Sequence, residues 1–164
     1  MSRRLRMVLS LEPTAAVPPV PSPLTIRPVR EDDREGLAVL MLEAYRGTVD
    51  DEGEDLGGAR EEVRRTFDGQ YGRFLPGSSV VTEDERGLVG ATLVTMWEGL
   101  PLVAFTMTRP DMKGRGVATA LMTRSLDLLR DAGHDSVQLV VTEGNDSAIR
   151  LYERLGFRAT SPPA

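Results

Sequence analysis

TRPDMKGRGVATAL, at residues 108–121, joins a predicted strand to a predicted helix. The apolar, β-favouring run before it ends at Pro110, which cannot donate a hydrogen bond to a sheet ladder. After it, apolar residues recur at helical spacing, and Gly133 follows at the position of a C-terminal cap. Residues 113–116 lie between these elements and combine two glycines with two cations, where the first N–H groups of a helix lack partners. The sequence therefore predicts an anion-binding loop at this junction.

Three phosphate-binding patterns can be compared with this loop. The Walker pattern G-x-x-x-x-G-K-[ST] is absent from the chain. The dinucleotide fingerprint G-x-G-x-x-G/A matches Gly114 and Gly116, but its third position is Thr119, whose side chain would hinder close packing of helix on strand. The pattern [Q/R]-x-x-G-x-[G/A] fits Gly116 and Ala118, with Lys113 in place of Gln or Arg. In this form the loop resembles the acetyl-CoA loop of the GCN5-related N-acetyltransferase (GNAT) family.

A second motif follows the loop. Residues 137–141 predict another strand, and residues 145–157 then read NDSAIRLYERLGF. This segment resembles the GNAT motif N-x-x-A-x-x-x-Y-x-x-x-G-F, in register and downstream of the loop. On its own, the loop could be a glycine-rich turn without a ligand. Two motifs in the family's order favour the acetyltransferase interpretation instead.

The composition is that of a globular chain. Its 164 residues suffice for one domain with a substantial core, and no apolar run is long enough to cross a bilayer. The absence of cysteine excludes disulfides and thiolate sites. A formal net charge of -5 disfavours general binding of nucleic acid and slightly favours cationic substrates. We therefore predict a cytoplasmic protein with neither nucleic acid nor a membrane as its partner.

The first 23 residues differ from the rest of the chain. They hold three early arginines and then five prolines between residues 13 and 23. The start of the chain resembles a twin-arginine signal, but the apolar run that follows is too short for one. We interpret residues 1–23 as a Pro-rich disordered leader and residues 24–164 as a single GNAT-type acyltransferase domain. A ligand for a proline-binding partner is a less favoured alternative for the leader.

The predicted elements follow the order strand, helix, helix, three antiparallel strands, helix, strand, helix and a short final strand. This order indicates a mixed α/β (α+β) fold. The resemblance implies the same architecture, a mostly antiparallel central sheet flanked by helices, whose fourth and fifth strands splay apart to admit the thioester. Pro162 and Pro163 leave no room for the family's seventh strand. We therefore expect an incomplete wall at the acceptor site, which a partner subunit in a homodimer could supply.

The resemblance implies acetyl-CoA as the co-substrate, with no metal. N–H groups at the start of the helix that follows residues 113–116 would bind the anionic pyrophosphate of coenzyme A, and Lys113 and Arg115 would add positive charge. The edge of the preceding strand, including the backbone of Phe105, would pair with the pantetheine amides, and Asn145 would cap the last helix and contact the pantetheine. The predicted cofactor-binding residues are Met107, Thr108, Lys113, Gly114, Arg115, Gly116, Val117, Ala118, Thr119, Asn145 and Ala148.

For the reaction, the resemblance implies direct attack by a primary amine of a small molecule or peptide on the thioester. The departing thiolate, with a pKa of about 8.5, is helped by a proton donor. Tyr152 is our candidate acid because it matches the motif's tyrosine, although helical periodicity alone favours a core tyrosine. The amine must also lose a proton. Residues 102–108 hold no carboxylate to accept it, so Glu98 is the nearest candidate base.

An acidic segment, DDEGED at residues 50–55, supports two interpretations. It could be a solvated loop that stabilises the positive N-terminal end of the next helix. It could also be a rim that recruits an ammonium substrate. A different function is open as well: without a carboxylate on the fourth strand, the chain could be a non-catalytic acyl-CoA-binding regulatory or interaction module of the same fold.

Overall fold

The computed structural model describes residues 3–11 and 25–160, which form four α-helices, three short 3-10 helices and eight strands. The strands are β1 (Arg4–Ser10), β2 (Ile26–Pro28), β3 (Arg73–Phe74), β4 (Val80–Asp84), β5 (Gly87–Trp97), β6 (Leu100–Thr108), β7 (Ser136–Thr142) and β8 (Arg158–Ala159). The helices are α1 (Arg34–Tyr45), α2 (Leu56–Phe67), α3 (Val117–Asp131), α4 (Asp146–Arg154), η1 (Glu31–Asp33), η2 (Pro76–Ser78) and η3 (Pro110–Met112).

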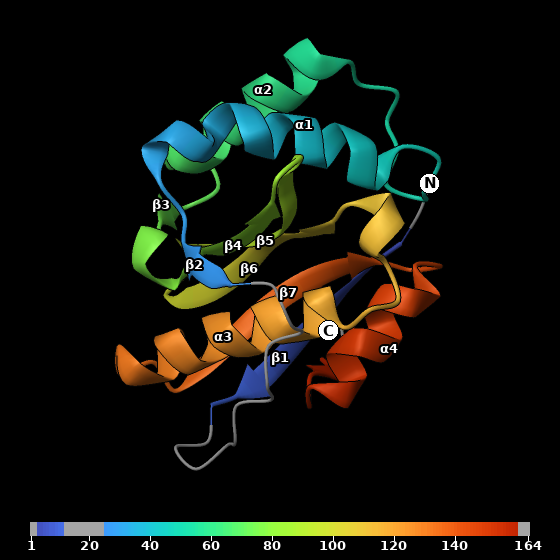
Figure 1. Cartoon of the computed structure of the whole chain (residues 1–164). Helices are drawn as coiled ribbons and strands as arrows, with labels where there is room; N and C mark the ends of the chain where they lie inside the picture. Colours follow the sequence, from blue (N-terminus) through green and yellow to red (C-terminus); the bar gives the residue numbers. More distant parts are fainter. Residues whose placement is uncertain (1–2, 12–24, 161–164) are drawn as a thin grey trace.

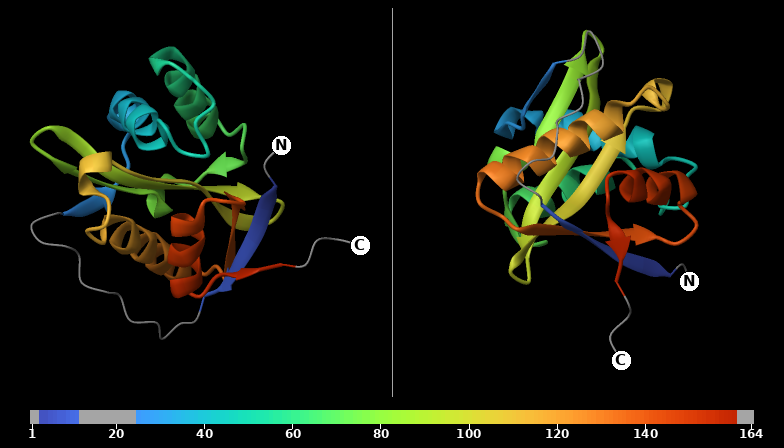
Figure 2. Two further views of the ribbon diagram at one scale, coloured as in Figure 1. Left: turned by 90° about the vertical axis from the view of Figure 1, so that its right-hand side faces the viewer. Right: turned by 90° about the horizontal axis from the view of Figure 1, so that it is seen from below.

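The strands form one sheet in the order β2-β4-β5-β6-β7-β1-β8, with β3 paired to β5. Neighbouring strands are antiparallel except β6 and β7, which are parallel. Helices α1 and α2 cover one face of the sheet, and α3 and α4 cover the other (Figure 1 and Figure 2). The predicted mixed α/β fold, with a mostly antiparallel sheet between helices, is confirmed.

Strand β5 lies in the middle of the core and is buried along eight consecutive residues. Helix α3 approaches one face of β5 closely at Gly90. A Cβ atom at Gly90 would lie 2.7 Å from Leu121 Cδ1 and 3.0 Å from Val117 Cγ1. A side chain at this position would push the Leu121 and Val117 side chains away, so glycine at residue 90 permits the close packing of α3 on β5.

The two parallel strands separate soon after they begin to pair. Strands β6 and β7 are in register only at Leu102 with Gln138 and at Val103 with Leu139. Beyond these pairs, β6 continues to Thr108 and β7 to Thr142 without a mutual ladder. The two strands run in diverging directions (Figure 2). The expected splay between the two strands that precede and follow α3 is therefore present.

The prediction of a disordered leader is wrong for residues 4–10, which form β1. This strand pairs antiparallel with β7 from Arg4 opposite Thr142 to Ser10 opposite Ser136, and β8 pairs with its outer edge. The sequence carried the signal as an alternation of Arg4, Leu5, Arg6 and Met7, which is the period of a half-buried strand. The remainder of the expected leader, residues 12–23, lies outside the described residues.

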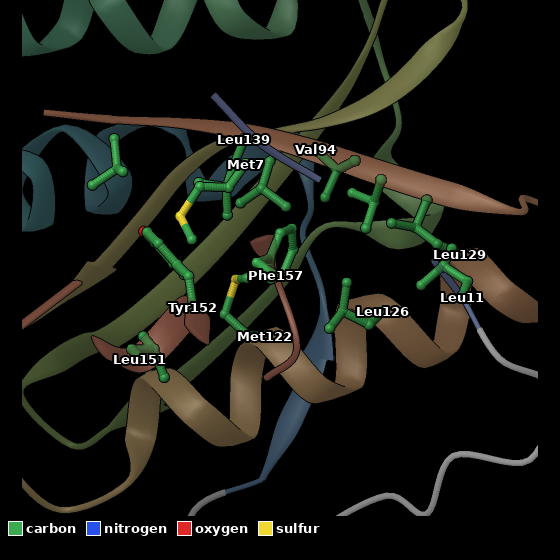
Figure 3. Close-up of a cluster of buried hydrophobic side chains, with 13 residues drawn as sticks. Met7, Leu11, Val94, Met122, Leu126, Leu129, Leu139, Leu151, Tyr152 and Phe157 are labelled. Atoms are coloured by element: carbon green, nitrogen blue, oxygen red, sulfur yellow. The ribbon is translucent and has the colours of Figure 1, made fainter. Parts of the chain in front are cut away.

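Strand β1 also fills the position that we expected to be vacant. Its Met7 is 2% exposed and packs in a cluster with Leu139 of β7, Tyr152 of α4 and Phe157 (Figure 3). The place beside β7 is thus occupied by the chain's own N-terminal segment, so no partner strand is required there. The chain closes this wall of the sheet by itself.

Candidate functional site

The loop before α3 has the geometry expected of an anion site. Gly114 and Gly116 have φ values of 80° and 81°, in the left-handed region that favours glycine. Gly116 is the N-cap of α3, and no side chain caps this helix. Residues 113–116 are exposed, so the first N–H groups of a 15-residue helix face solvent. The positive end of the helix dipole is therefore available to an anion.

A buried arginine that sequence analysis missed holds the start of this loop. Arg109, 6% exposed, donates hydrogen bonds to both carboxylate oxygens of Asp84 at 3.0 and 2.6 Å, and its Nε donates to Asp111 at 2.7 Å. Its backbone N–H donates to the carbonyl of Val89 at 2.7 Å. The Arg109 guanidinium holds the pKa of the Asp84 carboxyl well below its usual range. This clamp fixes the end of β6 to the β4–β5 hairpin.

The single lysine of the chain lies at the same loop. Lys113 Nζ is 3.5 Å from the carbonyl oxygen of Ala44, in the last turn of α1. A cation is favourable there because helix C-termini carry partial negative charge. The Lys113 side chain thus connects the loop to α1, while Arg115 beside it is exposed.

A cavity of about 740 Å³ opens where β6 and β7 separate. Its lining comes from both halves of the chain. The lining residues are Arg4 of β1, Met41 and Tyr45 of α1, Asp50, Glu52 and Glu54 between α1 and α2, Glu62 of α2, Tyr71, Trp97 of β5, residues 102–106 of β6, residues 140–142 of β7, and Asn145, Ala148 and Tyr152 at α4.

Tyr152 belongs both to the core and to the cavity. Its side chain is 7% exposed and packs edge-on against Phe157, with ring centroids 6.0 Å apart. Its hydroxyl points away from the Phe157 ring (Figure 3). Burial raises the pKa of the Tyr152 phenol above its ordinary value, and the nearby charge of Asp50 raises it further. The phenol is therefore protonated at neutral pH and can donate a hydrogen bond into the cavity.

A second phenol, that of Tyr45 at the end of α1, lines the same cavity. Burial raises the pKa of Tyr45, and the neighbouring Tyr152 and Asp50 raise it further. The last turn of α1 brings it there because the chain turns away after Tyr45. The cavity thus holds two protonated phenols.

The acidic segment at residues 50–55 divides between two tasks. Asp51 accepts hydrogen bonds from the backbone of Gly47 and Gly53, each at 2.8 Å, and Asp55 caps α2 by accepting from Gly58 N at 2.9 Å. The remaining acidic side chains of the segment line the cavity. The structural interpretation therefore fits Asp51 and Asp55, and recruitment of an ammonium substrate by the other acidic residues stays a prediction.

Asp50 links this segment to the opposite side of the cavity. Its carboxylate accepts hydrogen bonds from Thr142 Oγ1 at 2.7 Å and from Asn145 Nδ2 at 3.4 Å. The Asn145 Oδ1 atom accepts from Ala148 N at 3.4 Å, which confirms the predicted cap of α4. No local sequence pattern indicates the contact between residues 50 and 142.

Glu98 is not brought to the cavity. It lies with Gly99 at the tip of the β5–β6 hairpin, and both residues have positive φ values of 50° and 84°, as in a two-residue turn of type I′. Its side chain is exposed and does not line the cavity, although its neighbour Trp97 does. The choice of Glu98 as base rested on its place at the end of a strand, and this role stays a prediction.

The other predicted residues fall into three groups. Asn145, Ala148 and Tyr152 line the cavity. Residues 113–119 form the separate loop and first turn of α3, in which Val117 is buried. Met107 is 2% exposed and packs toward α1, and Thr108 ends β6. Within β6 the cavity is lined instead by residues 102–106.

Neither a membrane-spanning helix nor a metal-binding cluster is found in the part of the chain that the structure describes. None of its helices is both long and apolar enough to cross a membrane. No group of three acidic or histidine side chains in residues 3–11 and 25–160 is arranged to hold a metal ion.

Comparison with known proteins places these features in context. The model of the acetyltransferase (GNAT) family matches residues 32–157. Curated relatives include mycothiol acetyltransferases from Propionibacterium freudenreichii, 28% identical over 87% of this chain and 45% of the relative, and from Clavibacter sepedonicus, 37% identical over 52% of this chain and 28% of the relative. The chain therefore spans less than half the length of these relatives.

Solved structures share the fold. A GCN5-related N-acetyltransferase from Sphaerobacter thermophilus aligns with a TM-score of 0.76 and 20% identity over 97% of this chain and 50% of the other. The PaiA N-acetyltransferase from Thermoplasma acidophilum, solved in complex with coenzyme A, aligns with a TM-score of 0.65 and 15% identity over 86% of this chain and 93% of the other.

Proposed function

Because the chain belongs to the acetyltransferase (GNAT) family, we propose that it is an acetyl-CoA-dependent N-acetyltransferase whose acceptor is a primary amine of a small molecule or peptide. One observation carries the proposal: Tyr152, a buried and protonated phenol, lines a cavity at the point where β6 and β7 separate. The acidic segment after α1 lines the same cavity.

The described residues fit coenzyme A in two ways. The uncapped N-terminus of α3 offers backbone N–H groups to a pyrophosphate, and no atom lies within 4 Å of a Cβ built at Gly114, so an anion can approach the backbone closely. The edge of β6 that faces the gap has no ladder partner beyond Val103. Its free backbone groups can pair with the amides of a pantetheine arm.

When bound, acetyl-CoA supplies an activated acyl group with a thiolate leaving group. The acceptor amine forms a bond to the acyl carbon, and the carbon–sulfur bond breaks. Tyr152 donates a hydrogen bond to the departing sulfur and passes its proton along that bond. The nitrogen, which becomes acidic once it is bonded to the acyl carbon, returns a proton to the phenol. The raised pKa of Tyr152 keeps the donor protonated until the sulfur becomes negative.

A non-catalytic acyl-CoA-binding module of the same fold is the second candidate. The observation in its favour is that residues 102–108 hold no carboxylate and Glu98 lies outside the cavity. The curated relatives are named mycothiol acetyltransferases, and this name suggests mycothiol or a related compound as a further compound to test. It enters the panel below as one compound among several, because the match covers less than half of those proteins.

Two measurements test the proposal. Calorimetry measures acetyl-CoA binding by the intact chain and by Gly116→Glu, which puts a carboxylate at the N-cap of α3. A free-thiol assay then measures coenzyme A release with a panel of amines, for the intact chain and for Tyr152→Phe. Binding that is lost in the Gly116 variant, together with amine-dependent release that slows in the Tyr152 variant, supports the enzyme. Tight binding without release under any amine supports the module, and absence of binding contradicts both.

A further inference from the structure

Four carboxylates form one wall of the cavity, and we call them the acidic wall: Asp50, Glu52, Glu54 and Glu62. In the described part of the chain, none of them lies within ion-pair distance of a lysine or arginine. Arg4 is the one basic side chain among the described residues that line the cavity.

Several carboxylates outside the cavity, by contrast, form ion pairs with arginines. Asp33 pairs with Arg27 at 2.8 Å, and Asp84 pairs with Arg109 at 2.6 Å. Even exposed carboxylates find arginine partners, as Glu35 does with Arg60 at 2.6 Å. Four unpaired like charges around one cavity repel one another, and their combined field attracts cations.

The acidic wall is not needed to build its own segment. The backbone of that segment is satisfied by Asp51 and Asp55, whose side chains accept hydrogen bonds from Gly47, Gly53 and Gly58. The side chains of Glu52 and Glu54 form none of the ion pairs or side-chain hydrogen bonds found among the described residues. The negative charges of Glu52 and Glu54 are therefore available to attract a cationic ligand in the cavity.

An unpartnered hydroxyl on a buried side chain reaches the same cavity. Tyr152 is 93% buried, since its exposed fraction is 7%, and it lines the cavity with the acidic wall. In the described residues its hydroxyl has no hydrogen-bond partner, and it points away from the Phe157 ring (Figure 3). The hydroxyl is therefore available to a group that arrives with the substrate.

The sheet adds exposed apolar side chains to the cavity, beside polar ones from β1, β6 and β7. Val140 and Trp97 are 46% and 44% exposed, and both line the cavity. The backbone carbonyl of Trp97 is fixed by Gln138 Nε2 at 2.9 Å, and Arg6 of β1 donates to Gln138 Oε1 at 3.0 Å. A cavity that combines the acidic wall with these apolar side chains suits a carbon chain that carries separated positive charges.

We propose that the acceptor is an amine with at least one further ammonium group on a carbon chain, so that one nitrogen is acetylated beside Tyr152 while another is held by Glu52 and Glu54. This inference rests on the proposed function and names its substrate class. Acetylation converts one ammonium nitrogen into a neutral amide. That nitrogen loses two protons, of which one goes to the sulfur and one to solvent, and the second ammonium group keeps its protons. The product carries one positive charge less than the acceptor, so the acidic wall holds it less strongly and favours its release.

The test compares butylamine with 1,4-diaminobutane, which have the same carbon chain and differ by one ammonium group. Calorimetry with coenzyme A present measures the Kd of each amine, and the thiol assay measures kcat/KM. We expect the diamine to bind about tenfold more tightly at low salt, which corresponds to about 1.4 kcal/mol, and less so at high salt.

Variants then assign the preference. Glu52→Gln with Glu54→Gln is expected to bring the Kd of the diamine to that of butylamine. Glu85→Gln removes one negative charge from the exposed β4–β5 turn and is expected to change neither Kd. Equal Kd values for the two amines in the unmodified chain, or a preference that survives in the double variant, would overturn the proposal. Selective diamine binding without thiol release would support the ligand class while contradicting the proposed enzyme.

Discussion

The Asp50 carboxylate accepts a hydrogen bond from the Thr142 hydroxyl at 2.7 Å, and this contact joins the segment after α1 to the end of β7. Asn145, at the start of α4, donates to the same carboxylate. Asp50 thus holds three separate parts of the chain together at the edge of the cavity. It also raises the pKa of Tyr152, so its charge acts on the proposed proton donor.

The first prediction separates the charge of Asp50 from its role in docking the segment. Asp50→Asn removes the charge, and Thr142→Val removes the hydrogen bond but keeps the charge. We expect Asp50→Asn to raise the acceptor KM about tenfold and Thr142→Val about threefold, because a net hydrogen bond contributes about 1 kcal/mol and a charge acts in addition. Steady-state kinetics measures both. Equal effects would show that Asp50 acts only by docking the segment.

The second prediction concerns the two phenols of the cavity. Tyr152→Phe keeps the ring that packs against Phe157 and removes the hydroxyl, so we expect folding to be retained while kcat falls about 100-fold, in the range of general acid catalysis. Tyr45→Phe is the matched control, since Tyr45 lines the same cavity. It is expected to change kcat by less than about threefold, well below that range. A larger loss in the Tyr45 variant would assign the donor role to Tyr45.

The third prediction follows from the raised pKa of both phenols. In the folded protein Tyr45 and Tyr152 keep their protons above the ordinary tyrosine pKa of about 10, whereas in the unfolded chain they ionise near that value. Their contribution to stability is therefore complete below about pH 10 and is lost as the pH rises above it. Denaturant unfolding between pH 8 and 11 measures this loss. The double variant Tyr45→Phe, Tyr152→Phe should show a shallower decline, and an unchanged decline would contradict the burial of the two phenols.

Local chemistry made part of this site predictable. Gly114 and Gly116 adopt positive φ, and Asn145 caps α4, because each depends on its immediate neighbours. The contact of Asp50 with Thr142 spans 92 residues, and that of Arg6 with Gln138 spans 132. Such contacts are set by the order of strands in the sheet, which no local pattern encodes.

The error at residues 4–10 and the untested choice of Glu98 have the same origin. The alternation in residues 4–10 is too short to outweigh the proline-rich composition that follows, so β1 was assigned to a leader. Glu98 was assigned to the site from its place at the end of a predicted strand, but it lies at the tip of a two-residue turn and does not line the cavity. In both cases strand pairing overrides composition and proximity along the chain.

The fourth prediction concerns the clamp on the loop before α3. Arg109→Met removes the buried partner of the Asp84 and Asp111 carboxylates and the hydrogen bonds that join β6 to the β4–β5 hairpin, so we expect it to lower the free energy of unfolding. Acetyl-CoA affinity is expected to fall with it, since the loop start is no longer fixed. Because the pKa of Asp84 is depressed, the pair stabilises the fold above the ordinary carboxyl pKa of about 4, and this contribution is lost as the pH falls below it. Urea unfolding at pH 7 and pH 3 measures both effects, and an equal loss at the two pH values would contradict the ion pair.

The fifth prediction tests the N-terminal strand. Met7 is 2% exposed in the cluster that also holds Tyr152, so Met7→Ala should lower the free energy of unfolding by about 2–5 kcal/mol, as for other buried large-to-small changes. Arg4→Ala, on the exposed face of the same strand, is the matched control and should change stability by less than about 0.5 kcal/mol. Because Arg4 lines the cavity and opposes the acidic wall, its loss should also lower the KM of a diamine acceptor. If Met7→Ala were as stable as the unmodified chain, residues 4–10 would not be part of the sheet in solution, and the wall of the cavity beside β7 would have to be formed by another segment.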